Sequence, residues 1–256
     1  KNTEVLFTKE GKGAGYARNI GLSHARGKWI IFADADDFFT ANCFTILNEY
    51  MDSPHKVIYF NVRFVMSDDP SQESRRGTYY TNFFNDVNPE NKLRYQSQVP
   101  WGKMIRRSFL STFHIQFDET RIANDVYFSC LVGIYAPKVT TDRRIIYYCT
   151  ESDQSLAMSK QDRESLIIRF NASMKCNRLL RQEKIHYYLS PLPWCIPSAK
   201  TKEWLPAKYF FEYLFFFRLQ AFKELYYAFS AILSHMNEPA TKETDKCNKK
   251  TTNLKE

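Results

Sequence analysis

The segment WIIFADADDFF, residues 29–39, places five apolar residues directly before Asp34, with Asp36 and Asp37 close behind it. A continuous apolar run of this length is typical of a strand that is covered on both faces, as in a parallel sheet. Carboxylates this close repel one another unless a cation lies among them or solvent screens them. The segment therefore predicts either a metal site at the end of a buried strand or a solvated acidic turn.

The residues around this segment follow an α/β pattern. We expect a buried strand over 4–8, a helix over 15–27 whose C′ residue is Gly27, and the strand over 28–33. A helix capped by Thr40 follows. Its predicted apolar side holds Phe44, Leu47 and Met51. Because strands and helices alternate, the fold class is α/β with ligand sites at the carboxyl ends of its strands.

Further elements are predicted along the rest of the chain. Alternating apolar residues over 58–66 indicate a half-buried strand. After it we expect a short strand over 103–105 that enters a short helix. A further helix is predicted from the N-cap Asn124 to Pro137, with an apolar side formed by Val126, Cys130, Leu131 and Ile134. A strand over 143–149 and a long helix over 160–185 follow, and the apolar stripe of that helix holds Ile167, Phe170 and Met174.

Charge and aromatic residues concentrate in the C-terminal part. Nearly all of the net charge of +8 lies in residues 160–256, beside the aromatic run over 208–229. Charged residues interrupt this run, so it cannot span a membrane. Its predicted helical face holds Phe210, Leu214, Phe217, Ala221, Leu225 and Ile232. Consecutive aromatics fit an anionic membrane surface, or packing on the chain's own domain, better than a nucleic-acid groove.

The cysteines give no pattern of a metal site. They are Cys43, Cys130, Cys149, Cys176, Cys195 and Cys247. They lie about twenty or more positions apart without a CxxC pair, which argues against zinc and against a small disulfide framework. We expect reduced thiols in a cytoplasmic protein.

Three blocks of the sequence together resemble one enzyme family. They are GAGYARNIGLSHARGKWIIFADADDFF, PWGKMIRRSFL and NDVYFS. In motif, order and spacing they are similar to family 2 glycosyltransferases of the GT-A fold, over about residues 9–150. A phosphatase with an aspartate nucleophile also ends a strand in DxD, but here Asp37 and Phe38 follow where that class has Thr or Val.

The resemblance gives the acidic segment a role. It implies that Asp34-Ala35-Asp36 is a DxD motif in which Asp36 is the principal ligand of Mn²⁺ or Mg²⁺. Asp34 would face the ribose or the water shell of the metal, and Asp37 would support both. This agrees with the residues, because a sugar nucleotide leaves as a diphosphate whose charge a divalent cation neutralises.

The resemblance also implies a base and a donor site. Asp125 falls on the catalytic base, which takes the proton of the acceptor hydroxyl in an inverting displacement; otherwise it is an aspartate at a helix N-terminus. Asn124 replaces a glutamate of the family that is linked to acceptor binding. Arg18 and Asn19 would meet the nucleotide.

Trp101 and Lys103 would stack on a sugar and meet a phosphate. The alternative for this pair is a core tryptophan beside a solvated lysine. The alternative for Arg18 is an arginine on the surface without a binding role.

Three regions are expected: a GT-A domain over 1–150, lacking about the first fifty family residues, a helical, membrane-associating region over 151–236, and a disordered tail over 237–256.

The predicted function is an inverting, metal-dependent glycosyltransferase that moves a hexosyl or N-acetylhexosaminyl group from a UDP-sugar to a glycan or lipid-linked acceptor. This would serve bacterial capsule, exopolysaccharide or lipopolysaccharide synthesis at the inner face of the cytoplasmic membrane. The alternative is a noncatalytic transferase fragment that binds a membrane or a partner. Nucleic acid is not an expected partner.

Overall fold

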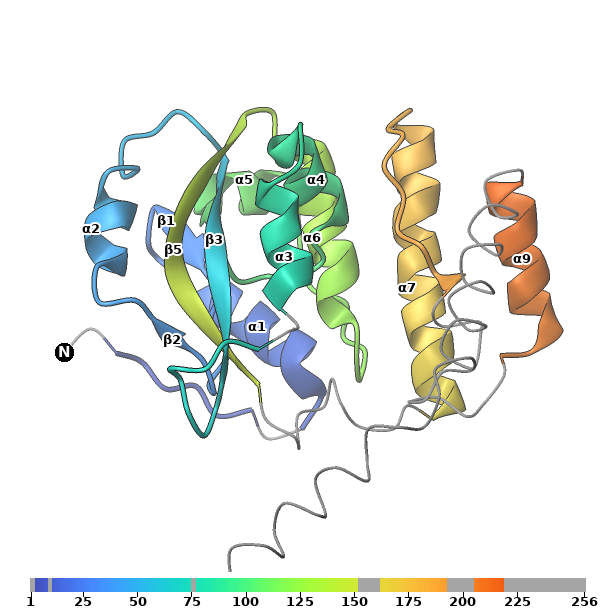
Figure 1. The fold of residues 1–256 in the computed structure, drawn as a ribbon, viewed down its shortest axis with the longest axis horizontal. Coiled ribbons are helices and arrows are strands. Elements are labelled where there is room, and N and C mark those ends of the chain that lie inside the picture. Colours follow the sequence, from blue (N-terminus) through green and yellow to red (C-terminus); the bar gives the residue numbers. More distant parts are fainter. Residues whose placement is uncertain (1–2, 9–10, 75–76, 152–161, 193–204, 219–256) are drawn as a thin grey trace, which may run out of the picture. The chain divides into compact units, whose positions relative to one another are not determined.

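The computed structural model describes residues 3–8, 11–74, 77–151, 162–192 and 205–218. The chain divides into two units, Lys1–Leu205 and Pro206–Glu256, and each is described by itself. Figure 1 shows the ribbon of both units. The first unit contains the sheet and every predicted site residue.

The first unit is built on a five-stranded mixed sheet (Figure 1). Its strands, in spatial order, are β1 (Trp29–Ile31), β4 (Lys103–Arg106), β3 (Val57–Met66), β5 (Val139–Glu151) and β2 (Phe38–Phe39). β3 and β5 are parallel, and the pairs β1–β4, β4–β3 and β5–β2 are antiparallel. β1 and β2 therefore lie at opposite edges, although few residues separate them in the chain.

Helices cover both faces of this sheet. They are α1 (Gly13–His24), α2 (Cys43–Asn48), α3 (Gly77–Phe84), α4 (Pro89–Gln96), α5 (Arg107–Thr112), α6 (Asn124–Tyr135) and α7 (Arg163–Gln182). In Figure 1, α2 lies on one face, α3, α4 and α6 lie on the other, and α7 packs on the outer side of α6. The sheet is thus the middle layer of the unit, and α7 belongs to the same unit as the sheet.

The structure confirms the α/β class and corrects two strand predictions. β1 was expected to be a parallel strand covered on both faces, but it is an antiparallel edge strand that is buried only at Ile30. β3 was expected to be half-buried, but its side chains are buried on both faces because helices cover both. The hydrophobic pattern predicted where both strands lie in the sequence. It did not predict which strands pair with them or how deeply each is buried.

Several local predictions are also wrong. Residues 4–8 are exposed and form no strand, since no strand of the described residues pairs with them. The N-cap of α2 is Asn42 instead of Thr40, which begins a turn by accepting a hydrogen bond from Cys43. On α2 and just after it, Phe44 and Met51 are exposed.

Two helix ends also differ from the predictions. The helix α1 ends before Gly27, because Ala25 is already extended. Ala123, in a left-handed conformation, takes the N-cap position predicted for Asn124. The apolar stripe of α7 is as predicted at Phe170 and Met174, which are buried.

A disulfide joins Cys130 of α6 to Cys176 of α7, with the two Cα atoms 6.0 Å apart. The expectation of reduced thiols is therefore wrong for this pair, because positions far apart in sequence meet where the two helices pack. Cys43 and Cys149 are free and buried. Cys195 and Cys247 lie outside the described residues.

The second unit contributes α9 (Ala207–Phe217) to the description. Phe217 is buried, while Phe210 and Leu214 are partly exposed. The exposed aromatics are Phe211 and Phe215. The rest of the predicted aromatic face, from Ala221 onward, and the predicted tail over 237–256 lie outside the described residues. Across the part of the chain that is described, no helix is long and apolar enough to cross a membrane.

Candidate functional site

The three aspartates lie in a turn, here called the acidic turn (residues 34–37), between the two edge strands β1 and β2. The backbone N–H of Asp37 donates to the carbonyl oxygen of Asp34 at 3.2 Å and closes the turn. Because β1 and β2 are at opposite edges, this connection crosses the end of the sheet. The crossing places the turn beyond the carboxyl end of β1, where the sequence predicted a site.

Residues of β5 hold the acidic turn in place. The Tyr147 hydroxyl accepts a hydrogen bond from the backbone N–H of Asp34 at 2.8 Å and donates to Asp37 Oδ2 at 2.7 Å. The backbone N–H of Thr150 donates to Asp37 Oδ1 at 2.7 Å, and its hydroxyl donates to the Asp36 carbonyl at 2.9 Å. Both carboxylate oxygens of Asp37 are thereby used within the protein, so Asp37 supports the turn.

Burial shifts the pKa values of Asp37 and Tyr147. It raises the pKa of Asp37, although the hydrogen bonds from Tyr147 and Thr150 favour the ionised form. The same burial, together with the hydrogen bond to Asp37, raises the pKa of Tyr147. Tyr147 therefore stays a neutral donor at physiological pH.

Arg18 of α1 joins the acidic turn to the start of α6. Its Nη2 donates to Asp34 Oδ1 at 2.5 Å, and its Nη1 donates to Asn124 Oδ1 at 2.8 Å. The guanidinium also lies over the Phe117 ring, 5.5 Å from its centroid. Gly15 lets α1 approach this closely, because a Cβ there would lie 2.9 Å from the Asn124 Cβ and would overlap the Asp118 carbonyl.

Three of the predicted site residues make hydrogen bonds within the protein. One oxygen of Asp34 is committed to Arg18, so the carboxylate is not wholly available to a metal or a ribose. The amide of Asn124 accepts from the same arginine and is buried. Asn19, predicted at the nucleotide, instead exchanges two hydrogen bonds with the backbone of Phe117, at 2.8 and 3.0 Å. These side chains organise the site from within.

Asp36 is the member of the acidic turn whose side chain faces solvent. It is exposed, and no hydrogen bond or ion pair reaches its carboxylate from the described residues. Within those residues, no cluster of three His, Cys, Asp or Glu side chains could hold a metal alone. One free carboxylate nevertheless fits a Mg²⁺ or Mn²⁺ ion, because these ions commonly use one or two protein carboxylates plus substrate phosphates and water.

Asp125 lies in the first turn of α6 and is partly buried. Burial raises the pKa of its carboxyl, although its own backbone N–H, Arg18 and Lys103 favour the charged form. A carboxylate with a raised pKa accepts a proton more readily than an ordinary aspartate does. The position at a helix N-terminus limits that shift by favouring the anion.

Trp101 and Lys103 lie in the core, contrary to the predicted contacts with sugar and phosphate. Trp101 packs against Phe64, Tyr80 and Tyr147. Lys103 is fully buried, and its Nζ donates to the carbonyl oxygens of Ser97 at 3.0 Å and Val99 at 2.5 Å. Burial lowers the pKa of Lys103 to about 7.

Sequence reasoning missed the two residues that hold the turn, Tyr147 and Thr150. The only sequence signal was the apolar run over 143–149, which predicts a strand that contains Tyr147. That run does not predict a hydrogen-bond partner for the tyrosine hydroxyl. Tyr147 is 110 positions from Asp37. Only the sheet order, in which β2 pairs with β5, brings them together.

Comparisons with known proteins agree with this architecture. The sequence model of glycosyl transferase family 2 matches residues 1–113. A crystal structure of residues 1–349 of TarS from S. aureus, in complex with UDP-GlcNAc, is similar with a TM-score of 0.51 and 19% sequence identity, over 72% of this chain and 50% of that one. The same part of TarS in complex with UDP gives a TM-score of 0.48 and 19% identity, over 72% and 48%.

No curated protein sequence matches the chain. The chain spans about half the length of the solved TarS 1–349 structures that it resembles. The family match covers the part of the chain that contains β1, the acidic turn and β4. Residues 1–113 thus resemble glycosyl transferase family 2, and the first unit has the GT-A fold.

Proposed function

We propose that this chain transfers a sugar from a nucleotide diphosphate donor to an acceptor hydroxyl, with inversion at the anomeric carbon. The observation that carries the proposal is the Arg18 bridge. It joins the acidic turn, with its exposed Asp36, to the helix start that holds Asp125. Arg18 thus joins the two segments that carry these carboxylates, one available to a cation and the other suited to accept a proton.

Asp36 is the residue that would hold the divalent cation. A bound Mg²⁺ or Mn²⁺ would neutralise the charge that develops on the leaving diphosphate. Tyr147 and Thr150 hold the backbone of the turn from which Asp36 projects, so the attachment point of its carboxylate is held in place. Preorganised groups of this kind stabilise a transition state without rearranging during the reaction.

Asp125 is the proposed general base. It takes the proton of the acceptor hydroxyl as the oxygen attacks the anomeric carbon, and the bond from that carbon to the diphosphate breaks. Its raised pKa increases its affinity for this proton. Arg18 and Lys103 oppose this shift by favouring the ionised form, which is the form that acts as a base.

A UDP-sugar is the proposed donor. The support is TarS, which has this fold and was crystallised in complex with UDP-GlcNAc. The acceptor is proposed to be a glycan or a lipid-linked hydroxyl at the inner face of the cytoplasmic membrane, in synthesis of a bacterial surface polysaccharide. On α9, Phe211 and Phe215 are one turn apart and 65% and 78% exposed, with Lys208 on the preceding turn. Aromatic and basic residues in this arrangement suit an anionic membrane surface.

Release of UDP from UDP-sugars tests the proposed function. With Mn²⁺ present, we expect UDP to raise the melting temperature of the chain, because a ligand that binds only the native state stabilises it. We also expect slow release of UDP from UDP-GlcNAc or another UDP-hexose. A chain that neither gains stability nor releases UDP with any of these donors would contradict the proposal.

A further inference from the structure

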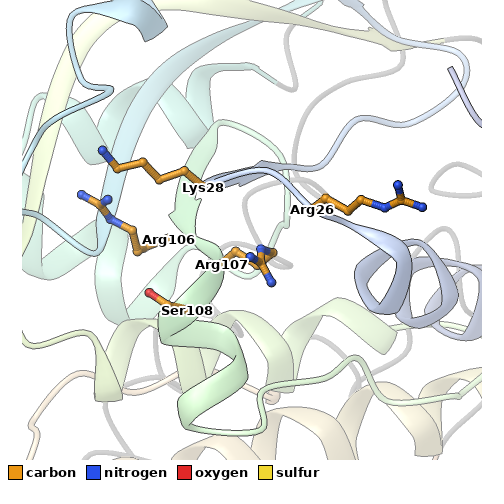
Figure 2. Close-up of a pocket in the computed structure, with 5 residues that line it drawn as sticks. All are labelled: Arg26, Lys28, Arg106, Arg107 and Ser108. Carbon is orange, nitrogen blue, oxygen red and sulfur yellow. The ribbon is translucent and has the colours of Figure 1, made fainter. Parts of the chain in front are cut away.

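A hollow of the first unit, apart from the acidic turn, is strongly basic. It has a volume of about 330 Å³ and is lined by Arg26, Lys28, Arg106, Arg107 and Ser108, here called the basic pocket. Figure 2 shows these five residues, with Lys28 and Arg106 on one side of Arg107 and Arg26 extending on the other. The proposed transfer reaction uses none of them.

The basic pocket lies at the opposite end of β1 from the acidic turn. Lys28 immediately precedes β1, and the pair Arg106 and Arg107 marks the passage from β4 to α5. These ends meet because β1 and β4 are antiparallel. The backbone N–H of Arg107 donates to the Lys28 carbonyl at 3.1 Å, and its Nε donates to the Gly27 carbonyl at 2.8 Å. The pocket is therefore distinct from a donor diphosphate site at Asp36.

The positive charge of this pocket is largely uncompensated. Lys28 pairs with Asp52 at 2.8 Å. None of the three arginines forms an ion pair with a carboxylate from the described parts of the chain. The Arg106 guanidinium lies over the Trp29 ring at 4.1 Å, and its buried Nε has no hydrogen-bond partner there. Donors of this kind are costly to leave unsatisfied.

We propose that the basic pocket binds a phosphate-bearing group with more than one negative charge, such as a diphosphate or the headgroup of an anionic phospholipid. Guanidinium groups bind phosphate oxygens through paired N–H donors, and the Ser108 hydroxyl adds a further donor. A volume of about 330 Å³ is near the lower end for ligand pockets, so it suits a compact headgroup. The shared chemistry of both ligands is the phosphate group.

Arg26 and Lys28 are suitable positions for a test because both are exposed and neither supports the core. The double variant Arg26→Gln/Lys28→Gln removes two charges from the pocket. Its matched control is Arg143→Gln/Lys184→Gln, which removes the same charge from two exposed positions on β5 and just beyond α7. Both variants have the same net charge, so a difference between them reports on the pocket alone.

The first measurement is calorimetric titration of inorganic pyrophosphate into the whole chain, with EDTA present to exclude metal. We expect binding that weakens with salt, and about tenfold weaker binding in the pocket variant, equivalent to about 1.4 kcal/mol. The control variant should bind as the wild type does. Asp36→Ala should also bind pyrophosphate normally, so a failure of the proposed transfer function would leave this result unaffected.

The second measurement separates a soluble ligand from a lipid. The whole chain is floated with phosphatidylcholine vesicles, with and without phosphatidylglycerol. Selective loss of flotation with anionic vesicles in the pocket variant would support a lipid headgroup. Selective loss of pyrophosphate binding, with equal flotation of both variants, would support a soluble phosphate ligand. The proposal is overturned if the pocket variant and the control variant behave alike with both probes.

Discussion

The acidic turn and the start of α6, which Arg18 joins, each carry one aspartate of the proposed site, yet the two carboxylates differ in environment. Asp36 is exposed and unpaired among the described residues, whereas Asp125 is partly buried and burial raises its pKa. The difference shows how one residue type can serve two purposes. An exposed carboxylate is available to a cation and water, and a desolvated one has the proton affinity that a base needs.

Removing the exposed carboxylate should have the largest effect. We expect Asp36→Ala to abolish Mn²⁺-dependent binding of UDP while the fold is retained, because hydrogen bonds to its backbone hold the turn. Calorimetric titration of UDP with Mn²⁺ present measures this. Glu183→Ala, which removes an exposed carboxylate at the end of α7, is the control. Unchanged affinity in Asp36→Ala would remove the metal assignment.

Neutralising the partly buried carboxylate of Asp125 should affect the rate instead. We expect Asp125→Asn to lower turnover by at least ~10²-fold with little change in donor binding, which is the usual scale for loss of a general base. Its melting temperature at neutral pH should not fall, since an amide avoids the cost of burying a charge. Turnover within a few-fold of the wild type would assign the base to another group.

The pH dependence follows from the same carboxyl. Because the pKa of Asp125 is raised, the acid prefers its neutral form in the folded state, and the base becomes active only as pH rises through that raised value. The acid limb of kcat/KM should therefore lie above the ordinary aspartate pKa of about 3.9. This limb should be absent from the residual activity of Asp125→Asn. A limb at the ordinary value would contradict the role of burial.

The support of the acidic turn gives a smaller expected effect. Tyr147→Phe leaves the Asp34 N–H without its acceptor and one Asp37 oxygen without its donor. We expect a loss of about 1–3 kcal/mol in the free energy of unfolding and a fall in turnover of about tenfold. Tyr148→Phe, which removes the neighbouring hydroxyl, is the control for denaturant unfolding and kinetics. Equal effects in both variants would show that the Tyr147 hydroxyl does not position the turn.

Sequence reasoning located the elements of this site better than their surroundings. The apolar run before Asp34 identified β1 and the turn beyond it, because strand length and turn residues are local properties. Strand pairing is not local, so the antiparallel edge position of β1 and the hydroxyl of Tyr147 could not be predicted. Lys103 was predicted to meet a phosphate or to be solvated, whereas it is fully buried, which is rare for lysine. The Ser97 and Val99 carbonyls that accept hydrogen bonds from its ammonium are brought to it by the fold, which no local sequence pattern predicts.

The smallest predicted effect tests how the protein sets the pKa of Asp125. Lys103 is one of the cations that lower this pKa, and with its own pKa of about 7 its charged form predominates at acidic pH. Lys103→Gln keeps a donor for the Ser97 and Val99 carbonyls and removes the charge. The acid limb of kcat/KM should therefore move upward by a fraction of a pH unit, because a nearby positive charge that favoured the carboxylate is lost.

The direction of this change separates electrostatic from structural effects. Looser packing around Lys103 would let water reach Asp125 and would move the limb downward, toward the ordinary value. Lys103→Arg, which retains a charge, should leave the limb near its wild-type position if it folds. A downward shift in Lys103→Gln would mean that Lys103 acts on Asp125 by excluding water and that its charge is secondary.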